Sequence, residues 1–155
     1  MVESRSESTT IVTASERATG QLVLSFGLRI ESGLCVSLVG SLGTGKSVLV
    51  RGICKGLGVD EDVLSPTFVL FEEYRGRIPV VHLDLYRLEH EREIEELGVF
   101  DRVGDGSVVL VEWGDRSPRL LDISNVIVSF EMAGETQRRI VVEYPKRLAA
   151  LFEGA

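Results

Sequence analysis

Short apolar runs and segments with helical spacing follow one another along the chain, and glycines separate them. Residues 34–39 and 108–111 are short and apolar, which is typical of strands buried on both faces of a sheet. Leu49 and Ile53 lie on one stripe of a predicted helix at 46–57. A strand, a glycine-rich turn and a helix in this order indicate an α/β protein.

Two further pairs of strands are predicted from their β-branched and aromatic residues. Residues 68–74 and 78–84 predict two strands joined by a tight turn, and residues 125–132 and 138–143 predict a hairpin. Strands joined so closely pair antiparallel. We therefore expect an α/β sheet to which antiparallel strands are added.

The remaining segments predict helices and a loose start to the chain. A capping-box pattern at 13–16 predicts the first turn of a helix, residues 89–97 read as an acidic helix, and a short helix follows Pro145. Residues 1–10 are polar, and we expect them to be flexible. Residues 11–155 contain no linker or repeat and are expected to form a single domain.

The segment between the strand at 34–39 and the next helix carries a phosphate-binding motif. It fits the pattern G-x-x-x-x-G-K-[ST] without a mismatch, and its residues are Gly40, Ser41, Leu42, Gly43, Thr44, Gly45, Lys46 and Ser47. The glycines let backbone N–H groups turn toward phosphate oxygens, and the helix adds its positive end. Lys46 supplies charge for the β- and γ-phosphates, and the Ser47 hydroxyl is offered to Mg²⁺.

Two acidic residues at strand ends are candidates for metal binding and hydrolysis. Glu112 follows the apolar run 108–111, and Asp84 ends the run that starts at Val80. A nucleotidase of this kind holds Mg²⁺ with an acid on a neighbouring strand. We assign Glu112 to Mg²⁺ and Asp84 to the attacking water or to the outer shell of the metal, and the reverse assignment is also chemically sensible.

Three neighbouring features leave more than one interpretation open. Strand alternation places His82 on the face of Asp84, where it is either a packed strand histidine or a catalytic group. Trp113 either stacks on a base or partner or belongs to the core. Ser65 and Thr67 flank a proline and form either a nucleotide-sensing switch loop or a turn that satisfies its own backbone.

Composition and charge narrow the classes of protein. The formal net charge is −7, which argues against a basic nucleic-acid-binding face as the dominant feature, and we expect no DNA binding. Eight acidic and three basic residues lie from Asp84 to Asp105, so most of the excess of acidic over basic residues is concentrated there.

The two cysteines, Cys35 and Cys54, lack metal-ligand spacing and are expected to be reduced and buried. No signal peptide or membrane-length apolar run is present, so we expect a cytoplasmic protein without a membrane contact.

Taken in order, the motifs resemble the bacterial TsaE family, formerly called YjeE, of ATPases in tRNA threonylcarbamoyladenosine biosynthesis. The resemblance covers nearly the whole chain and rests on the glycine-rich loop, Ser65-Pro66-Thr67-Phe68, His82-Leu83-Asp84-Leu85-Tyr86-Arg87-Leu88, Glu95-Glu96-Leu97-Gly98 and Val111-Glu112-Trp113. The chain departs from the family pattern at Ser41, where Asp is usual, and at Ser47, where Thr is usual. Ser47 keeps the hydroxyl that Mg²⁺ requires.

The resemblance implies a P-loop NTPase-like three-layer fold, with a central parallel sheet and flanking antiparallel strands. It implies ATP and Mg²⁺ as cofactors and slow, partner-dependent hydrolysis that supports turnover of the TsaB–TsaD complex, with an indirect link to tRNA. Carried over, Lys46 and Ser47 bind phosphate and Mg²⁺, and Asp84 and Glu112 serve the metal and hydrolysis. Thr67 and Trp113 belong to the nucleotide- or partner-facing site.

Two other functions remain open from the sequence. One is a small-molecule kinase, which would consume ATP faster when its acceptor is added. The other is a nucleotide-sensing module that hardly hydrolyses ATP. The acidic helix at 89–97 is either a solvated face or a docking surface for a basic patch of a partner.

Overall fold

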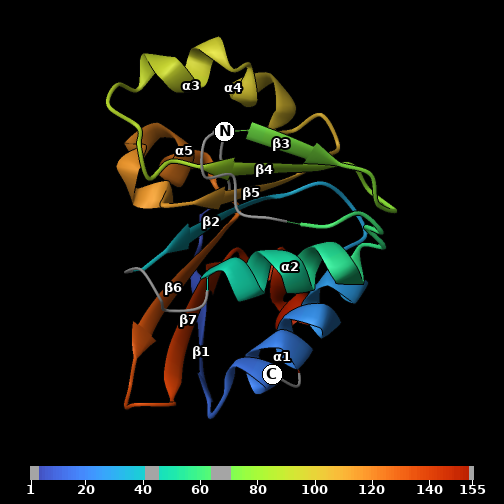
Figure 1. Cartoon of the computed structure of the whole chain (residues 1–155), viewed down its shortest axis with the longest axis vertical. Helices are drawn as coiled ribbons and strands as arrows, with labels where there is room; N and C mark the ends of the chain where they lie inside the picture. Colours follow the sequence, from blue (N-terminus) through green and yellow to red (C-terminus); the bar gives the residue numbers. More distant parts are fainter. Residues whose placement is uncertain (1–3, 41–45, 64–70, 154–155) are drawn as a thin grey trace.

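The computed structural model of the chain describes residues 4–40, 46–63 and 71–153. Within these ranges one sheet of seven strands runs in the order β1-β7-β6-β2-β5-β4-β3 (Figure 1). The strands are β1 (Glu7–Thr13), β2 (Cys35–Val39), β3 (Phe71–Tyr74), β4 (Val80–Asp84), β5 (Val108–Glu112), β6 (Val126–Met132) and β7 (Arg138–Tyr144).

The centre of the sheet is parallel and its two margins are antiparallel. Strand β2 pairs parallel with β5 and β6, and β5 pairs parallel with β4. Strands β7 and β1 extend one side antiparallel, and β3 closes the other side antiparallel to β4. The predicted parallel centre with flanking antiparallel strands is confirmed.

Helices cover both faces of the sheet and create three layers (Figure 1). The α-helices are α1 (Glu16–Arg29), α2 (Lys46–Gly56), α3 (Arg92–Glu96), α4 (Val99–Arg102) and α5 (Pro118–Ile123), and two 3₁₀ helices are η1 (Gly114–Arg116) and η2 (Lys146–Phe152). One core joins α1 and α2 to the sheet, for example through Ile53 and Leu110. The other joins α3, α4 and α5 to the opposite face, for example through Ile94 and Val111.

Two sequence predictions near the start of the chain are wrong in detail. Residues 7–10, expected to be flexible, lie in β1, where Glu7 stands opposite Tyr144 of β7. Helix α1 is capped by Ser15, whose side chain accepts a hydrogen bond from the Ala18 N–H, rather than by Thr13. Thr13 ends β1 instead, and its hydroxyl pairs with that of Thr19. Both differences follow from pairing with β7, which draws Thr13 into the sheet.

The predicted acidic helix is shorter than its sequence pattern. Helix α3 covers Arg92–Glu96 only, and Gly98, with a φ of 73°, separates it from α4. A positive φ is a conformation in which glycine is favoured over other residues. The prediction of one helix over 89–97 is therefore replaced by two short helices joined at a glycine.

The first two helices approach each other closely through glycines. A Cβ added to Gly27 of α1 would lie 2.6 Å from the Ile53 carbonyl oxygen and 3.0 Å from the Gly56 Cα of α2. These are backbone atoms, so a side-chain rotation does not relieve the contact. Gly27 is therefore part of what sets the distance between α1 and the helix that follows the phosphate-binding motif.

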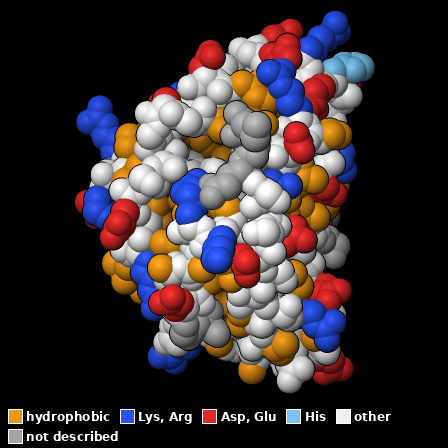
Figure 2. Space-filling view, turned by 180° about the vertical axis from the view of Figure 1, so that it is seen from behind, with side chains coloured by type: hydrophobic (Ala, Val, Ile, Leu, Met, Phe, Trp, Pro, Cys, Tyr) orange, Lys and Arg blue, Asp and Glu red, His pale blue; other side chains and the backbone are white. Residues whose placement is uncertain are grey.

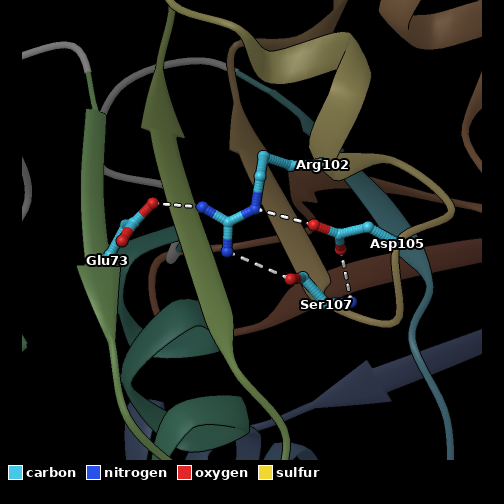
Figure 3. Close-up of polar contacts among 4 residues, drawn as sticks. All are labelled: Glu73, Arg102, Asp105 and Ser107. Carbon is cyan, nitrogen blue, oxygen red and sulfur yellow. Dashed lines mark hydrogen bonds and ion pairs between the residues drawn. The ribbon is translucent and has the colours of Figure 1, made fainter.

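An arginine fastens the sheet margin at β3 to the connection between α4 and β5 (Figure 3). The Arg102 guanidinium forms an ion pair with Glu73 of β3, and its Nε donates to Asp105 at 2.9 Å. Its Nη2 donates to the Ser107 hydroxyl at 3.2 Å. Hydrogen bonds from Ser107 and the neighbouring Arg102 charge hold the pKa of Asp105 below its ordinary value. The cluster holds the margin of the sheet against the start of β5.

The surface carries both signs of charge. On the face shown in Figure 2, Lys and Arg side chains are interspersed with Asp and Glu side chains rather than gathered into a patch of one sign. Among the residues that the structure describes, no helix has the length and apolar character needed to cross a membrane.

Candidate functional site

The carboxyl ends of three parallel strands meet at one edge of the sheet, where α2 begins. Leu38 of β2 lies opposite Glu112 of β5, and Glu112 lies opposite Asp84 of β4. In open α/β sheets, ligands bind in the crevice at this edge. The topology therefore brings the two predicted acidic residues side by side, although they are far apart in the sequence.

Glu112 joins the first turn of α2 to β4. Its Oε1 lies 3.5 Å from the Ser47 hydroxyl, at the outer limit of a hydrogen bond, and its Oε2 lies 2.7 Å from the His82 Nε2. The side chains of Glu112 and His82 are only 4% and 1% exposed. Alternation along β4 and β5 turns both residues toward α2, because their sequence neighbours Leu83 and Val111 pack into the opposite core.

Asp84 is the more accessible of the two acids. It is half-buried at the end of β4, and its Oδ1 accepts a hydrogen bond of 2.9 Å from the backbone N–H of Tyr86. That bond closes a local turn and fixes the carboxylate at the strand end. Asp84 and Glu112 thus lie side by side, one partly open to solvent and one enclosed.

An aromatic and cationic cluster borders the acidic pair. The rings of Tyr86 and Trp113 have centroids 5.1 Å apart, and the Arg116 guanidinium lies 5.3 Å from the Tyr86 ring and 5.5 Å from the Trp113 ring. Trp113 is half-buried, so it belongs partly to the core and partly to this surface. The sequence had indicated Trp113, whereas nothing in its pattern identified Arg116 as a neighbour of the site.

The backbone after Glu112 turns sharply. Trp113 has a φ of 59°, which is uncommon for a residue other than glycine. Gly114 then approaches β2 so closely that an added Cβ would lie 2.7 Å from the Ser37 Cβ. The Ser37 hydroxyl is 2.6 Å from that of Ser124, which donates to the Leu120 carbonyl. This packing holds the chain in the conformation that presents Trp113 beside Tyr86.

Several predicted site residues lie outside the described residues. They are Ser41, Leu42, Gly43, Thr44, Gly45 and the switch-loop residues Ser65 and Thr67, and Lys46 is described only by its backbone, at the start of α2. Gly40, at the end of β2, has a φ of 152°, a backbone conformation that side-chain-bearing residues rarely adopt. The strand and the helix on either side of the motif are confirmed as predicted.

The Ser47 hydroxyl and the Glu112 carboxylate offer oxygen atoms at this edge of the sheet. In the parts of the chain that the structure describes, no group of three or more His, Cys, Asp or Glu side chains is placed to hold a metal ion. A site with a serine hydroxyl and one carboxylate suits Mg²⁺, which keeps several waters and also takes phosphate oxygens. The two cysteines are buried and unpaired, as predicted.

Fold and site together define an α/β protein with a phosphate-binding sequence motif at the carboxyl edge of a largely parallel sheet. Comparison with known proteins identifies the family. Residues 13–151 match the family described as threonylcarbamoyl adenosine biosynthesis protein TsaE, and the chain belongs to this family. Its role is therefore in the biosynthesis of threonylcarbamoyladenosine in tRNA.

Relatives from several bacteria support this assignment. A protein from Treponema pallidum is 34% identical over 84% of this chain and 97% of its own length, and one from Nostoc is 38% identical over 85% of each. Both are named tRNA threonylcarbamoyladenosine biosynthesis protein TsaE. The crystal structure of YdiB from Bacillus subtilis has the same fold, with a TM-score of 0.75 and 24% identity over 95% of this chain and 93% of YdiB.

Proposed function

We propose that this protein binds ATP with Mg²⁺ at the carboxyl edge of the sheet and hydrolyses it as an accessory ATPase for tRNA threonylcarbamoyladenosine formation. The observation that supports this most is the contact between Ser47, the last residue of the phosphate-binding motif, and Glu112 at the end of the adjacent strand. A nucleotidase needs this pairing, because a motif hydroxyl and a strand-end acid share the metal.

The residues of the motif have three roles in this proposal. The backbone N–H groups of the motif, at Gly40, Ser41, Leu42, Gly43, Thr44 and Gly45, surround the phosphates, and Lys46 neutralises the β- and γ-phosphates. The Ser47 hydroxyl and the Glu112 carboxylate hold Mg²⁺, which when bound would neutralise charge that develops on the phosphate oxygens. Helix α2 directs its positive end at the same place.

Asp84 is proposed to orient the attacking water. Its carboxylate is partly solvent-accessible and lies in register with Glu112, whereas Glu112 is enclosed. A carboxylate in this position accepts a hydrogen bond from water and turns the oxygen lone pair toward the phosphate. We therefore favour the assignment that the sequence suggested, in which Glu112 binds the metal and Asp84 orients the water.

The partner is proposed to be the TsaB–TsaD complex, which performs the transfer to tRNA. The net charge of −7 argues against a basic tRNA-binding face as the dominant feature of the chain, so we assign tRNA binding to the partner. In the acidic segment at 89–97, Glu91 accepts a hydrogen bond from Ser117, and Glu95 forms an ion pair with Arg119 of α5. Glu89 and Glu96 are exposed and are the carboxylates that we assign to docking against a basic patch.

Phosphate release from ATP by the full chain tests the catalytic part of this proposal. We expect turnover to need Mg²⁺ and to fall to background in D84A and E112A, while E135A, an exposed carboxyl in the turn between β6 and β7, keeps wild-type turnover. Wild-type ATP turnover in both D84A and E112A would refute the proposal. Faster ATP consumption with a small acceptor and no protein partner would indicate a kinase instead.

A further inference from the structure

His82 is a buried polar group to which the proposed reaction gives no role. It lies on β4, its side chain is 1% exposed, and its Nε2 lies 2.7 Å from the Glu112 Oε2. Its other ring nitrogen, Nδ1, is buried and has no hydrogen-bond partner among the described residues. Burying a ring nitrogen without a partner costs free energy, and buried polar groups are nearly always paired. A role for His82 would explain why it is buried here.

The hydrogen-bond pattern defines which ring nitrogen carries the proton. A carboxylate only accepts hydrogen bonds, so the His82 Nε2–H donates to Glu112. The other ring nitrogen, Nδ1, has no partner among the described residues, so the bond from Nε2–H to Glu112 is the polar contact that orients the ring.

The contact with His82 also determines how Glu112 faces α2. A glutamate has three side-chain torsions, and the free energy of fixing them opposes a single orientation. In Glu112, one oxygen is held by His82, and the other is then directed at the Ser47 hydroxyl. Without the imidazole, Oε2 would be buried without this donor, and the carboxylate would gain by rotating away from Ser47.

We infer that His82 is a positioning residue, which holds one oxygen of Glu112 so that the other faces Ser47 and the proposed Mg²⁺. This inference rests on the proposed function, since it explains how the acid of the metal site is oriented. It assigns His82 no contact with nucleotide. Residues that orient a metal-binding side chain typically affect metal affinity or activity by about 10- to 100-fold.

The chain offers a matched set of variants for the test. The chain has two histidines, and the other, His90, is exposed, so H90Q is a control that also assigns the spectrum. In H82Q the glutamine side-chain amide can still donate a hydrogen bond to Glu112. In H82L the leucine side chain fills the space without a hydrogen-bond donor. Circular dichroism and urea unfolding of each variant establish that it folds.

The first measurement is the ¹⁵N spectrum of the histidine rings in the nucleotide-free full chain. We expect the His82 Nε2 to carry a proton, and the Nε2–H signal to move in E112L. A ring whose Nε2 carries no proton, or a spectrum unchanged in E112L, would overturn the inference. This readout does not depend on ATP hydrolysis.

The second measurement is the Mg²⁺ concentration needed to raise the thermal midpoint in saturating ADP. We expect H82L to need about 10- to 100-fold more Mg²⁺ and H82Q to recover most of the loss. A wild-type Mg²⁺ requirement in folded H82L would overturn the inference while leaving the proposed function intact. A wild-type protein that does not respond to Mg²⁺ and ADP would instead contradict the proposed function, and the ring spectrum would then decide the contact alone.

Discussion

Replacing Gly27 by alanine tests how the helix that follows the phosphate-binding motif is held. The new Cβ would lie 2.6 Å from the Ile53 carbonyl oxygen and 3.0 Å from the Gly56 Cα, so α1 and α2 must separate. Overpacking of this kind costs about 1–3 kcal/mol. Gly20 in the same helix provides a control, because its added Cβ would meet only the Val48 Cγ1 at 3.9 Å.

Both variants replace a helical glycine by alanine and therefore gain the same helix propensity. Only in G27A does the added Cβ come too close to backbone atoms of α2. Alanine in place of glycine inside a helix gains up to about 1 kcal/mol, so G20A is expected to be more stable than wild type. G27A is expected to be less stable than G20A by about 1–3 kcal/mol, which corresponds to a lower thermal midpoint by roughly 2–12 °C for a chain of this length. Urea unfolding and thermal melts measure both. Equal stability of G27A and G20A would refute the close contact between the helices.

Three further predictions concern the thiols, the Arg102 cluster and the aromatic surface. Burial raises the pKa of Cys35 to about 11 and that of Cys54 to about 12, so both thiols should react with a thiol reagent only after unfolding. The stability that these protonated thiols contribute is complete below pH 9.0 and should decline as the pH rises toward those values, and this decline should be smaller in C35A/C54A. Because the pKa of Asp105 is lowered, D105N should be less stable than wild type at neutral pH, and the difference in urea midpoint should vanish as the pH falls below 3.8. Removal of the guanidinium in R116A should shift the emission of Trp113, the only tryptophan, toward that of a more solvated ring, whereas removal of the exposed Arg17 of α1 in R17A should not.

Much of the fold could be predicted because local pattern and burial agree. The strand at 34–39 and the helix that follows the glycine-rich motif appear in the structure as β2 and α2. The apolar run 108–111 became β5, the hairpin at 125–143 became β6–β7, and the described part of the hairpin at 68–84 became β3–β4. In each case the side chains that give the pattern also fill one of the two cores.

The elements that were missed are stabilised by partners far away in the sequence. Strand β1 is half-exposed and polar at its start, and its main support is pairing with β7 at the other end of the chain. Helix α5 has six residues, too few for helical periodicity, and depends on the Ser117 cap and on Leu120 in the core. Neither feature leaves a periodic signal.

The candidate site was predicted as a set of residues but not as an arrangement. Alternation placed His82 and Asp84 on one face, which the structure confirms. That β4 lies next to β5, so that His82 meets Glu112, depends on the order of strands in the sheet, which no local pattern encodes. The left-handed Trp113 is likewise fixed by packing of Gly114 on Ser37.

ATP turnover by the full chain, alone and with TsaB–TsaD and tRNA, tests the central proposal most directly. We predict slow turnover alone and a clear increase with the partners, and we predict that K46A removes both while the variant stays folded. Turnover that is unchanged by the partners, or that persists in K46A, would contradict the account.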